Sequence, residues 1–200
     1  AVLHKGQPLQ MHNRWPQLWS QTVQQGCERA GKPECVAFMR SAFLRNQEHV
    51  PLMWAGDQMV DYSEQDGLAS AVYSMVGGGI SGFPLWHSDI GGYTSLDVKV
   101  EDYVRPPQLN ERWSEMQAFG VVMRTHETNR PAENAQVYDT TESRAAFARM
   151  TKVYRALQPY RKAVTDEAAR TGLPAMRSGW QVFPGTAAAD ADLQFFLGDH

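Results

Sequence analysis

The sequence predicts an α/β fold in which about four parallel strands alternate with helices, as in the C-terminal half of a (β/α)8 barrel. Short apolar runs, as at residues 35–39 and 50–54, lack the polar alternation of a half-exposed strand. Such runs are typical of parallel strands that are covered on both faces. Segments with apolar residues three and four apart separate these runs and predict amphipathic helices. A complete barrel takes about 250 residues, so four strands in 200 residues indicate half of one.

Local signals predict the individual elements. Ser63, followed by an acid three positions later, is a helix start, and the three glycines at 77–79 are expected to end that helix. Pro159 and Gly172 bound the last helix in the usual asymmetry of helix termini. The expected elements are helices over 15–29, 63–76, 108–121, 141–157 and 159–171 and strands over 35–39, 50–54, 80–86 and 174–183.

Composition excludes several classes of function. Apolar residues make up 42% of the chain and charged residues 20%, so it can bury a sizeable core. The net charge of −3, without a basic run, argues against a nucleic-acid partner, and no apolar stretch reaches the length of a membrane span. Cys27 and Cys35 fit neither a disulfide framework nor a zinc motif, so we expect two free thiols in a reducing compartment. With no signal peptide evident, the expected location is cytoplasmic.

Two carboxylates stand where a barrel carries its chemistry. Asp57 follows the strand expected at 50–54, and Asp89 follows the strand expected at 80–86. In barrels of this kind the active site lies at the carboxyl ends of the strands. A pair of carboxylates is what glycoside hydrolysis needs, because one must protonate the departing oxygen of an oxocarbenium-like transition state. An acid there can hold its proton near neutral pH if its surroundings are poorly solvated.

Five motifs carry a resemblance to the catalytic domain of family-31 α-glycosidases that spans most of the chain. They are Phe-Met-Arg-Ser at 38–41, Trp-Ala-Gly-Asp-Gln at 54–58, His-Ser-Asp-Ile-Gly-Gly-Tyr-Thr at 87–94, Met-Arg-Thr-His-Glu at 123–127 and the shorter Asp-Gly-Leu at 66–68. The second and third motifs resemble most closely the sulfoquinovosidase branch. Enzymes of that branch release sulfoquinovose, a glucose with a sulfonate at carbon 6, from sulfoquinovosyl glycerol-type glycosides. The resemblance therefore implies a retaining α-glycosidase that needs no cofactor and acts on a small carbohydrate, including an anionic sulfosugar glycoside.

The resemblance also implies roles for individual residues. Asp57 corresponds to the general acid/base, and Tyr93 to a tyrosine that helps to hold a water under the sulfonate. The residues that correspond to substrate-binding positions are Arg40, Trp54, His87, Asp89, Tyr93 and His126. A structural interpretation stands beside each functional one: a turn residue for Asp57, an ion-pair partner for Arg40, a packed loop aromatic for Tyr93. For His87 and Asp89, substrate contact and support of the site are equally favoured.

A retaining enzyme also needs a nucleophilic carboxylate, which the family carries on an earlier strand. Residues 1–10 contain no Asp or Glu, so the nucleophile is expected outside this chain. On this interpretation residues 1–192 are the second half of the barrel and residues 193–200 begin a β-rich domain. The sequence does not predict the oligomeric state.

Three alternatives remain open. One is an α-glucosidase or α-xylosidase of the same family, because the residues that meet carbon 6 lie upstream. Another is a non-catalytic sugar-binding remnant, because the nucleophile is absent. The third is a metal site built from His87, Asp89 and His126, which is disfavoured because their spacing matches no standard zinc motif.

Overall fold

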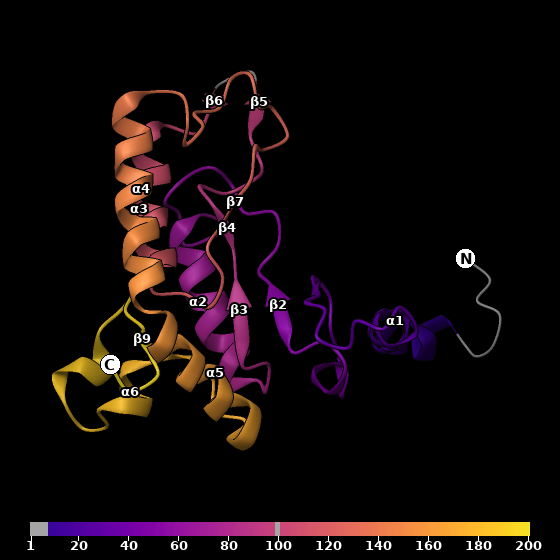
Figure 1. The fold of residues 1–200 in the computed structure, drawn as a ribbon. Helices are drawn as coiled ribbons and strands as arrows, with labels where there is room; N and C mark the ends of the chain where they lie inside the picture. The colour runs from indigo at the N-terminus through magenta and orange to yellow at the C-terminus, as the bar shows by residue number, and fades with distance from the viewer. Residues whose placement is uncertain (1–7, 99–100) are drawn as a thin grey trace. The chain divides into compact units, whose positions relative to one another are not determined.

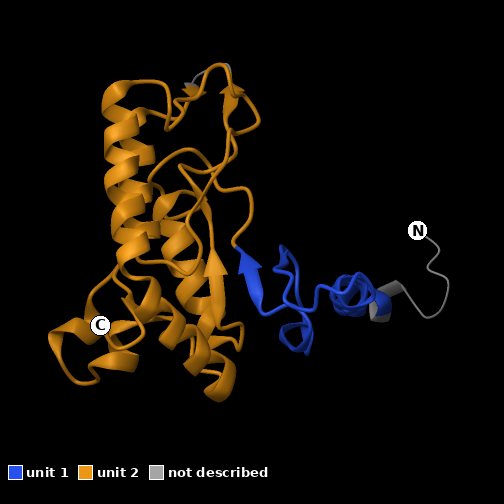
Figure 2. Cartoon of the chain, in the orientation of Figure 1, with its two compact units in different colours: residues 1–54 blue, residues 55–200 orange. Residues whose placement is uncertain are grey.

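The computed structural model describes residues 8–98 and 101–200. The chain divides into two compact units, residues 1–54 and residues 55–200 (Figure 2). None of the helices within the described residues is long and apolar enough to cross a membrane. Helices occur together with parallel strand pairs, so the α/β class is confirmed at the level of a mixed α/β fold.

The first unit holds a long helix and one parallel strand pair. Its elements are α1 (Pro8–Arg29), β1 (Phe38–Met39), the short 3-10 helix η1 (Asn46–Glu48) and β2 (Leu52–Trp54). β1 and β2 pair in parallel, with Phe38 opposite Leu52. The buried side chain of Asn46 donates to Ser20 Oγ at 3.1 Å, so a polar contact ties the segment before β2 to α1.

The cysteines depart from the sequence prediction. The chain reverses at Gly31, whose φ of 68° lies in the left-handed region that glycine tolerates. This turn brings the Cα atoms of Cys27 and Cys35 to 6.1 Å, and the two residues form a disulfide. The prediction of two free thiols is therefore wrong, because eight-residue spacing does not reveal that a tight turn brings the two ends together.

The second unit packs helices against short strands around a main apolar core, with a smaller apolar cluster of Val164, Ala175 and Leu197 (Figure 1). Its strands are β3 (Leu85–His87), β4 (Asp89–Ile90), β5 (Leu96–Val98), β6 (Glu101–Tyr103), β7 (Arg124–Thr125), β8 (Met176–Arg177) and β9 (Phe196–Leu197). Its helices are α2 (Leu68–Ile80), α3 (Pro107–Ala118), α4 (Thr141–Ala156), α5 (Gln158–Thr171), α6 (Gly179–Val182) and the 3-10 helix η2 (Ala187–Asp190). β4 and β7 pair in parallel. The buried core residues are Val60, Ala71, Met75, Ile90, Leu109, Trp113 and Met176.

The helix α2 continues through the three glycines that were expected to end it. A Cβ on Gly78 would lie 2.3 Å from the indole of Trp86, and one on Gly79 would lie 2.7 Å from Pro174 Cβ. Gly78 and Gly79 therefore serve close packing of the helix against neighbouring segments, and the three glycines do not act as a stop signal. The strand expected to begin at residue 80 is correspondingly shorter and covers only Leu85–His87.

The strand predicted over 174–183 is wrong for most of its length. Only Met176–Arg177 is a strand, and it pairs antiparallel with β9. Ser178 then caps the short helix α6 in a capping box with Gln181, so the backbone turns into a helix. An antiparallel hairpin of β5 and β6 was not predicted either.

The buried indole of Trp113 generates a stability prediction. Trp113 is fully buried, and its Nε1–H donates to Ser88 Oγ at 2.8 Å. We expect Trp113→Phe to lower the stability by about 1–3 kcal/mol, because a hydrogen bond is lost and the core loses volume. Thermal unfolding should show a midpoint lower by roughly 2–4 °C per kcal/mol. Trp180→Phe is the control, since Trp180 is 55% exposed; equal shifts for the two variants would contradict the assignment.

Candidate active site

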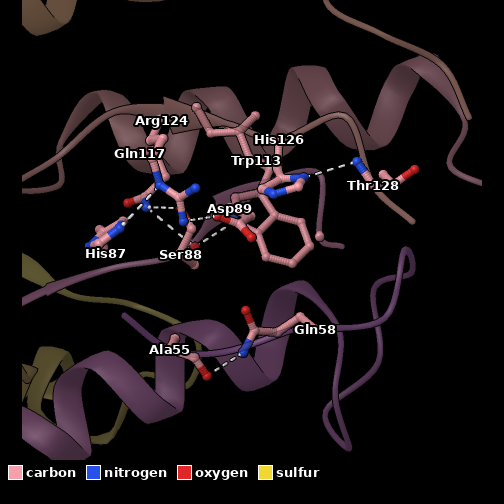
Figure 3. A network of polar contacts seen from close by, with 12 residues as sticks. Ala55, Gln58, His87, Ser88, Asp89, Trp113, Gln117, Arg124, His126 and Thr128 are labelled. Carbon is pink, nitrogen blue, oxygen red and sulfur yellow. Dashed lines mark hydrogen bonds and ion pairs between the residues drawn. The ribbon is translucent and has the colours of Figure 1, made fainter. Parts of the chain in front are cut away.

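The helix α3 sets the direction of the side chains at residues 87–89. Ser88 Oγ accepts a hydrogen bond from Trp113 Nε1, and the Ser88 carbonyl accepts one from Gln117 Nε2 at 3.0 Å. Successive side chains along extended backbone point to opposite faces. Because Ser88 faces α3, His87 and Asp89 point away from it (Figure 3). The sequence prediction that these two residues share a site is consistent with this alternation.

Arg124 binds both of these side chains. It is the cross-strand partner of Asp89 in the β4–β7 pair, and its Nη2 forms an ion pair with Asp89 Oδ1. Its Nε–H donates to His87 Nε2 at 3.3 Å. The neutral ring of His87 then carries its proton on Nδ1. Arg124 thus fixes the carboxylate and the imidazole in one arrangement (Figure 3).

The Asp89 carboxyl group is poorly solvated and has a shifted pKa. Its side chain is 0% exposed. Burial raises the pKa of Asp89 above its ordinary value, and the charges of Arg124 and His126 oppose that rise. The charge of Asp57 raises the pKa of Asp89 further. The two acids that the sequence predicted as a pair therefore interact electrostatically.

The loop that carries Asp57 is hydrogen-bonded to the loop that carries Tyr93. The carbonyl of Gln58 accepts the backbone N–H groups of both Tyr93 and Thr94, each at 2.8 Å. Thr94 Oγ1 donates to the carbonyl of Asp57 at 2.7 Å. Gly92 permits this approach, because its φ is 75° and a Cβ would lie 2.6 Å from Met59 O. The positions of Asp57 and Tyr93 are therefore coupled through backbone groups.

Tyr93 and His126 form an aromatic pair. Their ring centroids lie 4.9 Å apart at an interplanar angle of 87°. The backbone N–H of Thr128 donates to His126 Nδ1 at 3.1 Å (Figure 3). With Nδ1 accepting, the neutral ring carries its proton on Nε2, where it can donate to a ligand. Thr128 holds a left-handed φ of 78°, which is uncommon for a β-branched residue.

Arg40 and Trp54 lie in the first unit. The guanidinium carbon of Arg40 lies 5.7 Å from the centroid of the Trp54 ring, a cation–π contact. The Phe38 ring meets Trp54 edge-on at 6.3 Å. They belong to an open groove of about 440 Å³, half of whose lining residues are aromatic. The groove is lined by Trp15, Pro16, Trp19, Phe38, Met39, Arg40, Ser41 and Trp54. Flat aromatic surface beside a guanidinium suits a ligand with apolar faces and polar edges.

The structure brings some predicted residues together and adds others. Sequence reasoning missed Arg124 and Thr128 as site residues, although both lie in or beside the motif at 123–127. Arg124 precedes His126 by two positions at the end of a strand, so the alternation of strand side chains could have identified it. Within residues 8–98 and 101–200, no three His, Cys, Asp or Glu side chains converge in a way that could hold a metal ion. The cation that contacts both His87 and Asp89 is Arg124.

Comparisons with known proteins agree with these motifs. Residues 3–162 match the family model described as the glycosyl hydrolases family 31 TIM-barrel domain. The chain is 49% identical over 168 residues to a sulfoquinovosidase of Agrobacterium fabrum, covering 84% of the chain and 25% of that relative. It is 44% identical over 180 residues to a sulfoquinovosidase of Escherichia coli, covering 88% of the chain and 26% of that relative.

A solved structure is similar over nearly the whole chain. A family 31 sulfoquinovosidase from E. rectale, in complex with an aza-sugar inhibitor, matches with a TM-score of 0.91 and 39% identity. The match covers 98% of this chain and 29% of that chain. The chain thus spans about a quarter of the length of the curated relatives that it matches.

The raised pKa of Asp89 predicts a pH-dependent contribution to stability. Between the unfolded value of about 4 and the raised folded value, the folded state binds more protons than the unfolded state, so stability falls as the pH rises through that window. The Asp89→Asn variant cannot ionise at this position, so its stability should not fall with pH for this reason. The difference in melting temperature, wild type minus variant, should therefore decrease as the pH rises between these two pKa values. A difference that is constant with pH would contradict the assignment.

Proposed function

Because the chain belongs to glycoside hydrolase family 31, we propose that it is part of an enzyme that hydrolyses α-glycosidic bonds with retention of configuration. The proposed substrates are sulfoquinovosyl glycerol-type glycosides, from which sulfoquinovose is released. One observation carries the proposal: the carbonyl of Gln58 and the hydroxyl of Thr94 join the loop of Asp57 to the loop of Tyr93. These hydrogen bonds fix the position of the group that protonates the leaving oxygen relative to the group that recognises the sugar. The relatives named above, which are sulfoquinovosidases, support the substrate class.

Asp57 is the proposed general acid/base. Its half-buried side chain follows β2 directly, at the position where a barrel carries its catalytic groups. Asp89 is unsuited to be the nucleophile, because a nucleophile must reach the sugar, whereas the Asp89 side chain is fully buried and ion-paired with Arg124. A retaining enzyme needs a second carboxylate about 5–5.5 Å from the acid. We place that nucleophile outside these 200 residues.

The remaining site residues divide into two groups. His126, with a proton available on Nε2, and Tyr93 are proposed to contact sugar hydroxyls and the group at carbon 6. Arg40 and Trp54 are proposed to add an aromatic surface and a cation for the substrate. His87 and Asp89 are buried and bound by Arg124, so they are proposed to support the site rather than to touch the substrate.

The wider context of the chain is part of the proposal. Residues 1–192 are proposed as the second half of a (β/α)8 barrel and residues 193–200 as the start of the following domain. The parallel pairs β1–β2 and β4–β7 support this arrangement. A cytoplasmic location stays a proposal, and the disulfide of Cys27 and Cys35, which is more typical of oxidising compartments, stands against it. Thiol labelling of the protein in cells, with and without reductant, tests it.

An α-glucosidase or α-xylosidase activity is the second candidate. The observation in its favour is the edge-on packing of Tyr93 on His126. A tyrosine that serves chiefly to hold a neighbouring ring needs no anionic group at carbon 6. The two candidates therefore differ in what the Tyr93 hydroxyl does.

The acid role of Asp57 predicts a dependence on the leaving group. In the full-length enzyme, Asp57→Asn removes the transferable proton but keeps the shape. We expect a loss of roughly 100- to 10,000-fold in rate on poorly activated glycosides, and a smaller loss in the first step with a very acidic leaving group. Single-turnover kinetics on both substrates measure this. Asp97→Asn, at an exposed hairpin position, is the control, and equal losses on the two substrates would count against the acid role.

The choice between sulfoquinovoside and glucoside rests on Tyr93. If its hydroxyl supports a sulfonate, Tyr93→Phe should weaken transition-state binding of sulfoquinovosides by about 1.5–3 kcal/mol and that of matching glucosides by less. The ratio of kcat/KM values for the two sugars measures the difference. Tyr138→Phe is the matched control, because the exposed Tyr138 hydroxyl donates to Glu127. Equal effects of Tyr93→Phe on both sugars would favour the glucosidase alternative.

A further inference from the structure

Arg105 is a buried cation that the proposed mechanism does not use. It lies between β6 and α3 and is only 2% exposed. Its Nη1 donates to three backbone carbonyls, those of His126 at 2.9 Å, Gly92 at 3.3 Å and Ile90 at 3.4 Å. Its Nε donates to the carbonyl of Ala135 at 2.8 Å, and its Nη2 donates to Gln136 Oε1 at 2.9 Å. All five acceptors are neutral.

The three carbonyls that meet at Nη1 belong to the site. One is the carbonyl of His126 itself, one precedes Tyr93, and one follows Asp89. Carbonyl oxygens carry the negative end of the peptide dipole, so three that converge on one point repel each other unless a cation lies between them. The guanidinium therefore holds two separate chain segments, 90–92 and 126, at a defined separation. Since the rings of Tyr93 and His126 meet edge-on across this junction, their spacing depends on it.

Gly91, in the motif at 87–94, makes room for this cation. A Cβ on Gly91 would lie 2.6 Å from Arg105 Cδ and 2.2 Å from Asn110 Oδ1. The backbone N–H of Arg105 donates to Asn134 Oδ1 at 2.7 Å, which fixes the start of its side chain. Burial lowers the pKa of Arg105 to about 10, opposed by the charges of Asp139 and Asp89, so the group remains charged at neutral pH.

We propose that Arg105 is a positioning residue that acts through the carbonyls of Gly92 and His126 to set the separation of Tyr93 and His126, and with it the recognition of the sugar. The inference rests on the proposed function of these two residues. A cavity of about 110 Å³ borders Arg105, His126 and Gln136. When the cation is lost, the carbonyl-bearing segments can shift toward this space.

Arg161 is a matched control in the same unit. It is 6% exposed, and its guanidinium likewise donates to three backbone carbonyls. Those carbonyls belong to Gly120, Tyr154 and Ala118, which are not site residues. Loss of Arg161 should therefore cost stability of the same kind without displacing Tyr93 or His126.

The experiment compares Arg105→Lys, Arg105→Gln and Arg161→Gln in the full-length protein. The values of kcat and KM are measured on nitrophenyl α-sulfoquinovoside and α-glucoside, below the unfolding temperature of every variant. A displacement of about 1 Å can cost roughly 100-fold, so we expect kcat/KM of Arg105→Gln to fall by that order, mainly through KM. Arg105→Lys, which keeps the charge, should recover part of the loss. Arg161→Gln should stay within about two-fold of wild type, as expected for a residue away from the chemistry.

A double-mutant cycle separates positioning from stability. If Arg105 acts through Tyr93, Tyr93→Phe should cost less in the Arg105→Gln background than in the wild type, whereas Arg161→Gln and Tyr93→Phe should be additive. Additive effects for Arg105, or kinetics that match those of Arg161→Gln, would overturn the inference. Unfolding of both Arg105 variants under conditions where Arg161→Gln stays folded would also overturn it, by making Arg105 a residue of stability alone.

A readout without substrate separates this inference from the proposed function. The ring nitrogens of His126, observed in long-range ¹H–¹⁵N spectra of histidine-labelled protein, should shift in Arg105→Gln and not in Arg161→Gln. A wild-type protein that hydrolyses no α-glycoside would overturn the proposed function, while the His126 signals would still test Arg105. Unchanged His126 signals in an active Arg105→Gln protein would overturn the positioning role alone.

Discussion

The ion pair between Asp89 and Arg124 is the interaction on which the candidate site depends. It joins two neighbouring parallel strands at the point where both begin, and the same guanidinium binds His87. A carboxylate as fully buried as Asp89 could not ionise without a partner, because desolvation disfavours its charge. The pair therefore makes it possible to place two acids, Asp57 and Asp89, within electrostatic range while only one of them is accessible. Forming the pair costs desolvation free energy, so its role is to position the site side chains more than to stabilise the fold.

Around this pair the loops are held by polar groups. The carbonyl of Gln58 accepts two backbone N–H groups from the Tyr93 loop, and the backbone N–H of Thr128 donates to His126 Nδ1. The guanidinium of Arg105 donates to the carbonyls of Gly92 and His126, one from each of these loops. Polar contacts of this kind are directional, so they specify positions more narrowly than apolar packing does. The apolar core that contains Trp113 supplies a rigid support for these loops.

The helices were the most predictable part of the fold. Periodicity located α4 and α5 to within one or two residues, because an amphipathic surface helix shows its period directly in the sequence. The glycines in α2 were misjudged because Gly78 and Gly79 allow close packing against Trp86 and Pro174, which lie in segments that follow the helix. The strand predicted after Pro174 failed because Ser178 and Gln181 form a capping box that a run of apolar residues conceals.

The sequence by itself determined the α/β class, the family and the candidate acid, because motifs and strand ends are local features that survive without a structure. It also predicted that Tyr93, Asp89 and His126 belong to one site. Only the tertiary structure decided which of them are accessible: it buries Asp89 and His87 beneath Arg124 and leaves Nε2 of His126 to donate. Burial, tautomers and the partners of a cation such as Arg105 depend on contacts between residues far apart in the chain. The spacing of residues along one sequence does not predict those contacts.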